Sequence, residues 1–478
     1  MIPPPIDYLL HGTTTAKRAA GLRADLRIMA SNGGVATPAM VAEKPVMTLL
    51  SGLAAGVLGG AWVGESSGRR KLITFDIGGT SADIGIVVDG RYAETDPRST
   101  SIAGFPLPLP MIAIHTIGAG GGSIAYLDAG SAFRVGPRSA GAVPGPAAYG
   151  RGGALPTVTD PNVVLGRLDK DNFLGGGMKL DAEAADRVLD DLAGRLGLSK
   201  QEADEGVLTV INSNMANAIR SRTVQKGLDP REFALVAFGG AGPLHGAEVA
   251  HMLGIPEVVV PPYPGITSAM GLLTTDLKYD TIRTQFQVSG KIDLARLNAD
   301  LAAMQRGLGE QFAADHRDPA NLRFVRHGDL RYVGQGYELK IPFPEGELTE
   351  ASIVEIWRLF HEAHKREYGD YFEQNPIEIV NMRATGVGAM PKIRKLQAPA
   401  GGSLAAAKTR IGQCVFRVDG SLKTFETTFY RRALLPVGET FRGPAIVLQM
   451  HSTTVIPPRW SAVNDASGNL ILQLDGDA

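Results

Sequence analysis

From residue 1 to about residue 279, short apolar runs alternate with longer stretches whose apolar residues recur at helical spacing. The runs 71–75 and 84–88 flank a glycine-containing turn, a pattern that predicts a β-hairpin. Residues 181–196 and 204–226 have the spacing of helices. This part of the chain therefore mixes strands and helices.

A second strand followed by a glycine turn occurs further along. Residues 233–238 are wholly apolar and predict a buried strand, which runs directly into the glycine turn 239–242. A helix over 244–253 and a strand over 258–260 are expected next. The order strand, glycine turn, helix, strand is typical of an α/β domain.

Beyond about residue 281 the chain has fewer glycines and more charge. The elements expected here are two amphipathic helices and two strands, at 294–312, 351–368, 330–333 and 337–341. They predict a separate α+β domain. Residues 397–403 have the composition of a linker, and the short alternating runs that follow predict a small β domain.

Charge and cysteine content narrow the range of partners and sites that the chain can have. The chain has 48 basic and 49 acidic side chains, so no basic excess is available for a nucleic acid or an anionic membrane surface. Its single cysteine, Cys414, excludes a disulfide within the chain and a thiolate metal cluster. The apolar stretch 46–63 is interrupted by four glycines and is expected to be buried chain. With no secretory signal at its start, the sequence predicts a cytoplasmic protein.

Glycine is abundant, with 59 of 478 residues, and it clusters beside apolar runs. The turn 76–83 reads Asp-Ile-Gly-Gly-Thr-Ser-Ala-Asp. Its candidate phosphate ligands are Gly78, Gly79, Thr80 and Ser81, because paired glycines expose successive amides and the hydroxyls add donors. Asp76 and Asp83 are candidate catalytic acids, and Asp76 is a candidate ligand of Mg²⁺ through water. The alternative is an ordinary hairpin turn.

Two more glycine turns are candidates for ligand contact. In the first, Gly239, Gly240, Ala241 and Gly242 open a helix, which provides a platform for a base or amides for an anion, or else a tight structural turn. The second contains Gly118, Gly120, Gly121, Gly122 and Ser123, and it lacks the third glycine and the following acid of a dinucleotide fingerprint. His115 lies at its start as a candidate catalytic residue, with a structural histidine as the alternative. A Gly-x4-Gly-Lys-Ser/Thr sequence is absent.

The chain resembles the hydantoinase A/5-oxoprolinase family, which includes N-methylhydantoinase A and subunits of acetone and acetophenone carboxylases. The resemblance runs from about residue 22 to the C-terminus. The segments that carry it are 31–34, 50–52, 75–81, 116–125, 135–141, 144–146, 149–153, 156–160, 238–245, 268–271, 330–335, 368–369, 443–446 and 452–454.

This resemblance implies an α/β core like those of actin and the sugar kinases, which uses ATP and Mg²⁺. Family members phosphorylate a carbonyl oxygen of a lactam, a cyclic imide or a ketone enolate, which creates a good leaving group before ring opening or carboxylation. By the resemblance, residues 76–81 contact the β- and γ-phosphates, and residues 239–242 contact the nucleoside. Residues 118–123 and Asp160 are placed near the cleft, Asp160 as a further catalytic candidate.

The same resemblance gives the expected domain division. Residues 1–30 are expected to be a remnant of an N-terminal domain, 31–280 the ATP-binding core, 281–395 the α+β domain and 396–478 the C-terminal β domain. Family members usually begin with a further lobe that opens on its own Asp-x-Gly-Gly-Thr turn, and that turn is missing here. The N-terminal lobe is therefore expected to be incomplete.

Three functions remain open on the sequence. The first is an ATP-dependent hydrolase subunit that acts on a hydantoin or 5-oxoproline-like lactam, with a hydantoinase B-like subunit, further copies of itself, or both as partners. The second is an ATP-dependent ketone carboxylase subunit. The third is a non-catalytic subunit that binds a nucleotide or serves as a scaffold.

Overall fold

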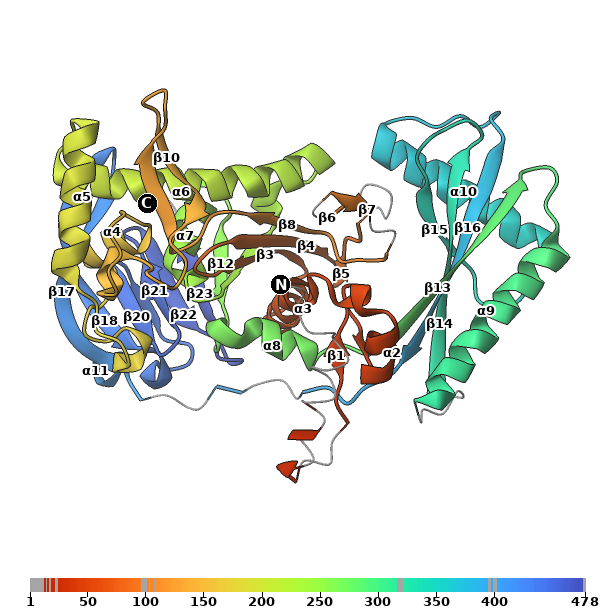
Figure 1. The fold of residues 1–478 in the computed structure, drawn as a ribbon, viewed down its shortest axis with the longest axis horizontal. Helices are drawn as coiled ribbons and strands as arrows, with labels where there is room; N and C mark the ends of the chain where they lie inside the picture. The colour runs from red at the N-terminus through yellow and green to blue at the C-terminus, as the bar shows by residue number, and fades with distance from the viewer. Residues whose placement is uncertain are drawn as a thin grey trace. The chain divides into compact units, whose positions relative to one another are not determined.

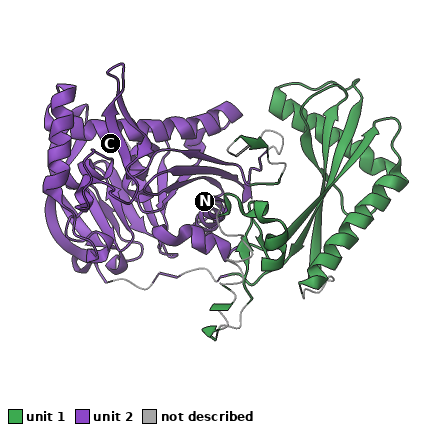
Figure 2. Ribbon diagram, in the orientation of Figure 1, with its two compact units in different colours: residues 1–51, 96–111, 275–392 green, residues 52–95, 112–274, 393–478 purple. Residues whose placement is uncertain are grey.

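The computed structural model describes residues 13, 15–16, 19–21, 25–95, 101–102, 104–106, 109–315, 321–393, 397–398 and 402–475. The chain folds into two compact units (Figure 2). Unit 1 comprises residues 1–51, 96–111 and 275–392, and unit 2 comprises residues 52–95, 112–274 and 393–478. Each unit is therefore assembled from segments that are far apart in the sequence.

A mixed nine-stranded sheet forms the centre of unit 2. Three neighbouring strands at its middle are parallel: β3 (Lys71–Ile77), β11 (Ala234–Phe238) and β12 (Glu257–Val260). Strand β4 (Ala82–Val88) runs antiparallel to β3, and β8 (Ile114–Ile117) runs antiparallel to β4; the three lie side by side in Figure 1. The side chains of β11 are buried throughout, as expected for a strand covered on both faces.

Helices cover both faces of this sheet. On one face lies α3 (Ser51–Ser66), whose glycines allow close approach: a Cβ on Gly60 would lie 2.5 Å from Thr74 Cγ2. On the other face lies α7 (Gly242–Leu253), where Gly246 meets the side chains of Ala237 and Val258. The remaining helices of the unit are α4 (Thr159–Val164), α5 (Ala182–Leu196), α6 (Lys200–Thr223), α8 (Thr267–Leu272) and α11 (Leu404–Ala407). Unit 2 is thus a layered α/β structure.

The C-terminal strands belong to this same unit. Strand β23 (Leu470–Leu474) pairs antiparallel with β12 and extends the central sheet through β22 (Trp460–Asn464) and β19 (Thr440–Arg442). A four-stranded sheet contains β17 (Lys408–Val418), β18 (Ser421–Arg431), β20 (Ala445–Gln449) and β21 (Ser452–Ile456). The strands β5 (Arg91–Tyr92), β9 (Ser123–Leu127) and β10 (Phe133–Ser139) complete the unit.

Unit 1 contains a six-stranded sheet with two long helices against it. The sheet order is β1 (Ile28–Met29), β2 (Val35–Ala36), β13 (Leu277–Val288), β16 (Ile377–Gly388), β14 (Leu322–Tyr332) and β15 (Leu339–Phe343). Helix α9 (Leu294–Ala314) packs on β13 through Phe312 and Tyr279, whose ring centroids are 4.9 Å apart. Helix α10 (Glu350–Tyr368) packs on Tyr332 through Phe360, also at 4.9 Å. The unit also holds α2 (Pro38–Glu43), β6 (Ser101–Ile102) and β7 (Phe105–Pro106).

The predicted hairpin and helices are confirmed, with shifts of up to four residues at their ends, the largest being the start of α6 at Lys200. The strand expected over 330–333 is only the end of β14, which begins at Leu322, and the sequence did not predict the long strands β13 and β16 of the same sheet. The two units divide the chain differently from the domains expected on the sequence. Residues 31–51 belong with 275–392, because β2 pairs with β13. The C-terminal strands belong with the core, because β23 completes its sheet. Among the described residues, no helix combines the length and the apolar character needed to cross a bilayer.

Candidate functional site

The two glycine turns singled out in the sequence lie side by side at one edge of the central sheet. Because β3 and β11 are parallel and Asp76 is level with Phe238, the chain leaves both strands at the same edge. The amide of Ala241 donates to the carbonyl of Ile77 at 3.0 Å and joins the turns directly. The space beyond the carboxyl ends of parallel strands is a common ligand site in α/β sheets.

The turn between β3 and β4 is exposed, with free space beside its two glycines. Gly78, Gly79 and Thr80 are exposed, and a Cβ on either glycine would meet no atom within 4 Å. The hairpin is closed by the Gly78 amide, which donates to the Ser81 carbonyl at 3.1 Å. The turn therefore presents backbone and hydroxyl donors to its surroundings.

The glycine loop of residues 118–123 packs against this turn and supports it. The amides of Gly121 and Gly122 donate to the carbonyls of Gly78 and Gly79 at 3.1 and 2.7 Å. Gly120 lies so close that a Cβ there would be 2.7 Å from the Thr80 amide nitrogen, and its own amide donates to Ser123 Oγ at 2.9 Å. The amides of Gly120, Gly121 and Gly122 therefore form hydrogen bonds within the protein, and the loop positions the turn.

Two carboxylates flank the turn on one face of the sheet. Asp76 and Asp83 are directly opposite each other on β3 and β4. Ser268 Oγ donates to Asp76 at 3.1 Å, and Thr116 Oγ1 donates to Asp83 at 2.6 Å. Burial, and to a smaller extent the charge of Asp83, raise the pKa of Asp76 to about 6. Burial also raises the pKa of Asp83.

A cation held beside the two carboxylates would lower both pKa values again, because it favours the charged form of each acid. No group of three or more potential metal-ligating side chains occurs in the described part of the chain. The acids present therefore fit a hydrated ion such as Mg²⁺, which keeps several of its waters. The two acids are too few to surround a metal ion with protein ligands alone.

A cavity of about 280 Å³ opens beside the turn. Its walls combine glycine backbone, aromatic and apolar side chains, and a few polar groups; they include Gly78, Gly79, Gly121, Tyr149, Thr159, Asn162, Phe173, Gly240, Ala241, Leu244, His245 and residues 449–453. The rings of Tyr149 and Phe173 pack together with centroids 5.9 Å apart. A small, mostly apolar cavity with an exposed turn of amide and hydroxyl donors at its rim suits a flat molecule that carries a charged tail.

His245 is a cavity residue that the sequence reasoning did not single out. Its Nδ1 lies 2.8 Å from Asn212 Oδ1, and its Nε2 has no hydrogen-bond partner among the described residues. Burial lowers the pKa of this histidine to about 3, so the ring is neutral. The signal available was its place in the first turn of the helix that follows a glycine turn.

His115 and Asp160 are not among the residues that line the cavity. His115 points to α6, where its Nδ1 lies 2.9 Å from Arg222 Nη2; burial, and to a smaller extent the charge of Arg222, lower its pKa. Asp160 is fully buried and accepts hydrogen bonds from the amides of Ala148 and Thr157 at 2.8 and 2.7 Å. It anchors the segments that carry Tyr149 and Thr159 into the cavity wall.

The fold and this site together define a mixed α/β protein with a glycine turn suited to holding an anion beside a small-molecule cavity. Comparison with known families makes the assignment more specific. The hydantoinase/oxoprolinase family matches residues 1–281, and the hydantoinase/oxoprolinase C-terminal domain matches residues 291–473. The chain belongs to the hydantoinase/oxoprolinase family.

Known relatives include enzymes of two kinds. The chain is 32% identical to caprolactamase subunit alpha of Pseudomonas jessenii over 94% of its own length and 64% of the relative's. It is 28% identical to the acetone carboxylase beta subunit of Xanthobacter autotrophicus, covering 95% of this chain and 64% of that one. The crystal structure of the ATP-dependent caprolactamase from Pseudomonas jessenii matches with a TM-score of 0.87 at 30% identity, over 100% of this chain and 69% of that one. The chain thus spans about two thirds of these relatives.

Proposed function

We propose that this chain is the nucleotide-binding subunit of an enzyme that uses ATP to phosphorylate the carbonyl oxygen of a cyclic amide before the ring is opened. The observation that carries the proposal is the junction of the two glycine turns at the cavity. Gly78 and Gly79 line one part of its wall, and Gly240 and Ala241 line another. A single nucleotide could contact both turns at once. We also propose that the core has the topology of actin-like and sugar-kinase-like ATPases.

The phosphates would be held by the β3–β4 turn. Its exposed glycines leave room for close approach, and the hydroxyls of Thr80 and Ser81 add donors. The nucleoside would occupy the cavity, with the base against the Gly240–Ala241 backbone and the rings of Tyr149 and Phe173. Asp76 and Asp83 would hold Mg²⁺ through water, and the ion would neutralise charge on the transferred phosphoryl group.

Such a site suits phosphoryl transfer, which depends on positioning and charge stabilisation more than on covalent chemistry by the protein. An amide carbonyl is a poor electrophile. Phosphorylation of its oxygen makes the carbon open to attack by water and turns the oxygen into part of a leaving group. The turn and the acids of this chain would perform the first step, the transfer itself.

The similarity to caprolactamase favours a lactam or a hydantoin-like ring as substrate. The similarity to acetone carboxylase keeps a ketone as the second candidate, with bicarbonate as the further reactant. The names of both relatives designate them as subunits. We propose that this chain likewise works in the cytoplasm with a second, hydantoinase B-like subunit, with further copies of itself, or with both.

Release of ADP separates the candidates. The purified protein, alone and with its partner subunit, is incubated with MgATP and caprolactam, 5-oxoproline or hydantoin, and in parallel with acetone and bicarbonate. We expect release that depends on one of the cyclic amides. Release only with the ketone and bicarbonate would assign the carboxylase activity instead. Retained ATP binding without release under either condition would contradict the enzymatic proposal and favour a non-catalytic nucleotide-binding subunit.

A further inference from the structure

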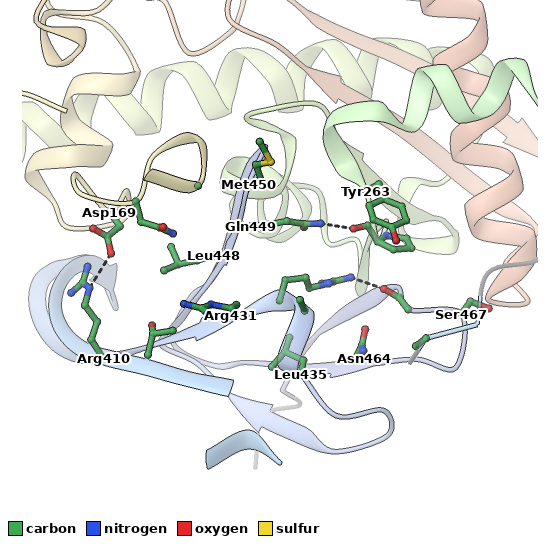
Figure 3. Close-up of a pocket in the computed structure, with 18 of the residues that line it drawn as sticks. Asp169, Tyr263, Arg410, Arg431, Leu435, Leu448, Gln449, Met450, Asn464 and Ser467 are labelled. Carbon is green, nitrogen blue, oxygen red and sulfur yellow. Dashed lines mark hydrogen bonds and ion pairs between the residues drawn. The ribbon is translucent and has the colours of Figure 1, made fainter. Parts of the chain in front are cut away.

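Unit 2 contains a second, larger cavity of about 660 Å³ (Figure 3). It shares Asn172, Gln449 and Met450 with the cavity beside the glycine turn, so the two are neighbours. None of the glycine turns or carboxylates of the candidate nucleotide site lines it. A volume of this size is in the range of pockets that hold small organic ligands.

Positive charge dominates this cavity. Three arginines line it, Arg410, Arg431 and Arg432, whereas Asp169 is the one acidic residue among its described lining residues. Asp169 is already paired, because Arg410 Nε lies 3.0 Å from Asp169 Oδ2. The Arg410 guanidinium also stacks on the Phe429 ring, 3.5 Å from its centroid. Two arginine charges therefore remain without an acidic partner in the cavity wall.

Arg432 is a buried cation without a carboxylate. Only 7% of the residue is exposed. Its Nη2 donates to the carbonyls of Val260 and Gly468 at 3.2 and 2.7 Å, and its Nη1 has no partner among the described residues. Burial lowers its pKa to about 9, and only the more distant charge of Asp465 opposes this shift. A buried guanidinium that contacts only carbonyl oxygens is costly unless an anion compensates it.

Arg431 precedes it in the chain and is exposed. Figure 3 shows its side chain beside Leu448, on the same side of the cavity as Asp169 and Arg410. The lining also contains the half-exposed ring of Tyr263 and the apolar side chain of Leu435. The cavity thus combines a cationic region with an aromatic and apolar one.

We propose that this cavity binds a small organic anion whose phosphate or carboxylate group pairs with Arg431, while the buried charge of Arg432 in the same wall adds to the positive potential. Arginine suits this task because its planar guanidinium donates two parallel hydrogen bonds to either group. The apolar body of the ligand would lie against Leu435, Leu448 and Tyr263. The site is separate from the proposed nucleotide site and does not depend on the function proposed for it.

Isothermal titration calorimetry at low ionic strength tests this proposal, with citrate as the carboxylate probe and glycerol 3-phosphate as the phosphate probe. The variant Arg431→Gln removes an exposed charge and is expected to fold normally, unlike a change at the buried Arg432. Arg442→Gln is the matched control, since Arg442 is exposed on β19 and does not line the cavity. Thermal unfolding without ligand verifies that all three proteins are folded.

We expect the wild type and Arg442→Gln to bind at least one probe equally well, and Arg431→Gln to bind it about tenfold more weakly. The same probe should raise the unfolding temperature of the wild type more than that of Arg431→Gln. Preference between the two probes identifies the anionic group. Absence of binding of both probes to the wild type, or equal affinity in Arg431→Gln, would overturn the proposal.

Discussion

At the scale of a single residue, the candidate site residue Asp76 lies where the folded protein disfavours its charged form. It lies one residue before the end of β3, opposite a second carboxylate, and its only hydrogen-bond partner among the described side chains is Ser268. Burial raises its pKa to about 6, which means that ionisation is less favourable in the folded protein than in the unfolded chain. A carboxylate kept in such a place fits a role with a cation and phosphates rather than a role in holding the fold.

Replacing Asp76 by asparagine should therefore stabilise the protein at alkaline pH. The ordinary pKa of 3.8 describes the unfolded chain and the value of about 6 the folded one. As the pH rises between these values, the unfolded state loses its proton first and the wild type loses stability. We expect Asp76→Asn to raise the free energy of unfolding at pH 8 by on the order of 1–3 kcal/mol, with no gain near pH 3. Urea denaturation without ligands measures this.

The same variant should lose ATP turnover, because the charge that would serve Mg²⁺ is gone. Asp191→Asn is a suitable control, since Asp191 is exposed on α5 and far along the chain from the turn. It should change neither stability nor turnover. A lower stability of Asp76→Asn at pH 8, or unchanged turnover, would contradict the role given to Asp76.

At the scale of elements, the β3–β4 turn of the candidate site is held in place by a neighbouring loop. The exposed β3–β4 turn lies on the loop 118–123, which in turn is fixed by Ser123 and by the segment anchored at Asp160. Position 120 requires glycine because a Cβ there would overlap the backbone of the β3–β4 turn. The conformation of the β3–β4 turn therefore depends on hydrogen bonds and close contacts with the loop 118–123.

A single methyl group at position 120 tests this dependence. In Gly120→Ala the new Cβ would lie 2.7 Å from the Thr80 nitrogen and 2.8 Å from the Gly78 oxygen, so the turn must shift. We expect a loss of about 1–3 kcal/mol in the free energy of unfolding, as for other overpacked sites. Gly194→Ala is the matched control, because that exposed helical glycine has no atom within 4 Å of the added Cβ. The control should be as stable as the wild type or slightly more stable.

Local patterns in the sequence predicted these elements well. The hairpin at 71–88 and the helices α5, α9 and α10 followed from residue periodicity, and the glycine turns marked two strand ends that the fold brings together. The sequence did not predict which distant segments pair in the sheets. Nothing in the run 470–474 indicates that it lies beside β12. The sequence also did not predict the contacts of His115 and Asp160. Their partners, Arg222 and Ala148, come close to them only in the folded protein.

At the scale of the whole molecule, both compact units are built from non-contiguous segments, and the candidate nucleotide site and the arginine-lined cavity belong entirely to unit 2. The similarity to caprolactamase covers both units, at a TM-score of 0.87. The names of two relatives indicate lactam hydrolysis and ketone carboxylation. A common ATP-using step in unit 2 would account for what these enzymes have in common.

Calorimetric titration of the chain with ATP and Mg²⁺ tests this account most directly. We predict one binding site per chain in the wild type and in Gly194→Ala, and affinity at least about tenfold weaker in Gly120→Ala, whose phosphate turn is displaced although no ligand contact is removed. Circular dichroism would verify that the variants are folded. Absence of ATP binding to the wild type, or equal affinity in Gly120→Ala, would contradict the claim that the β3–β4 turn holds the phosphates.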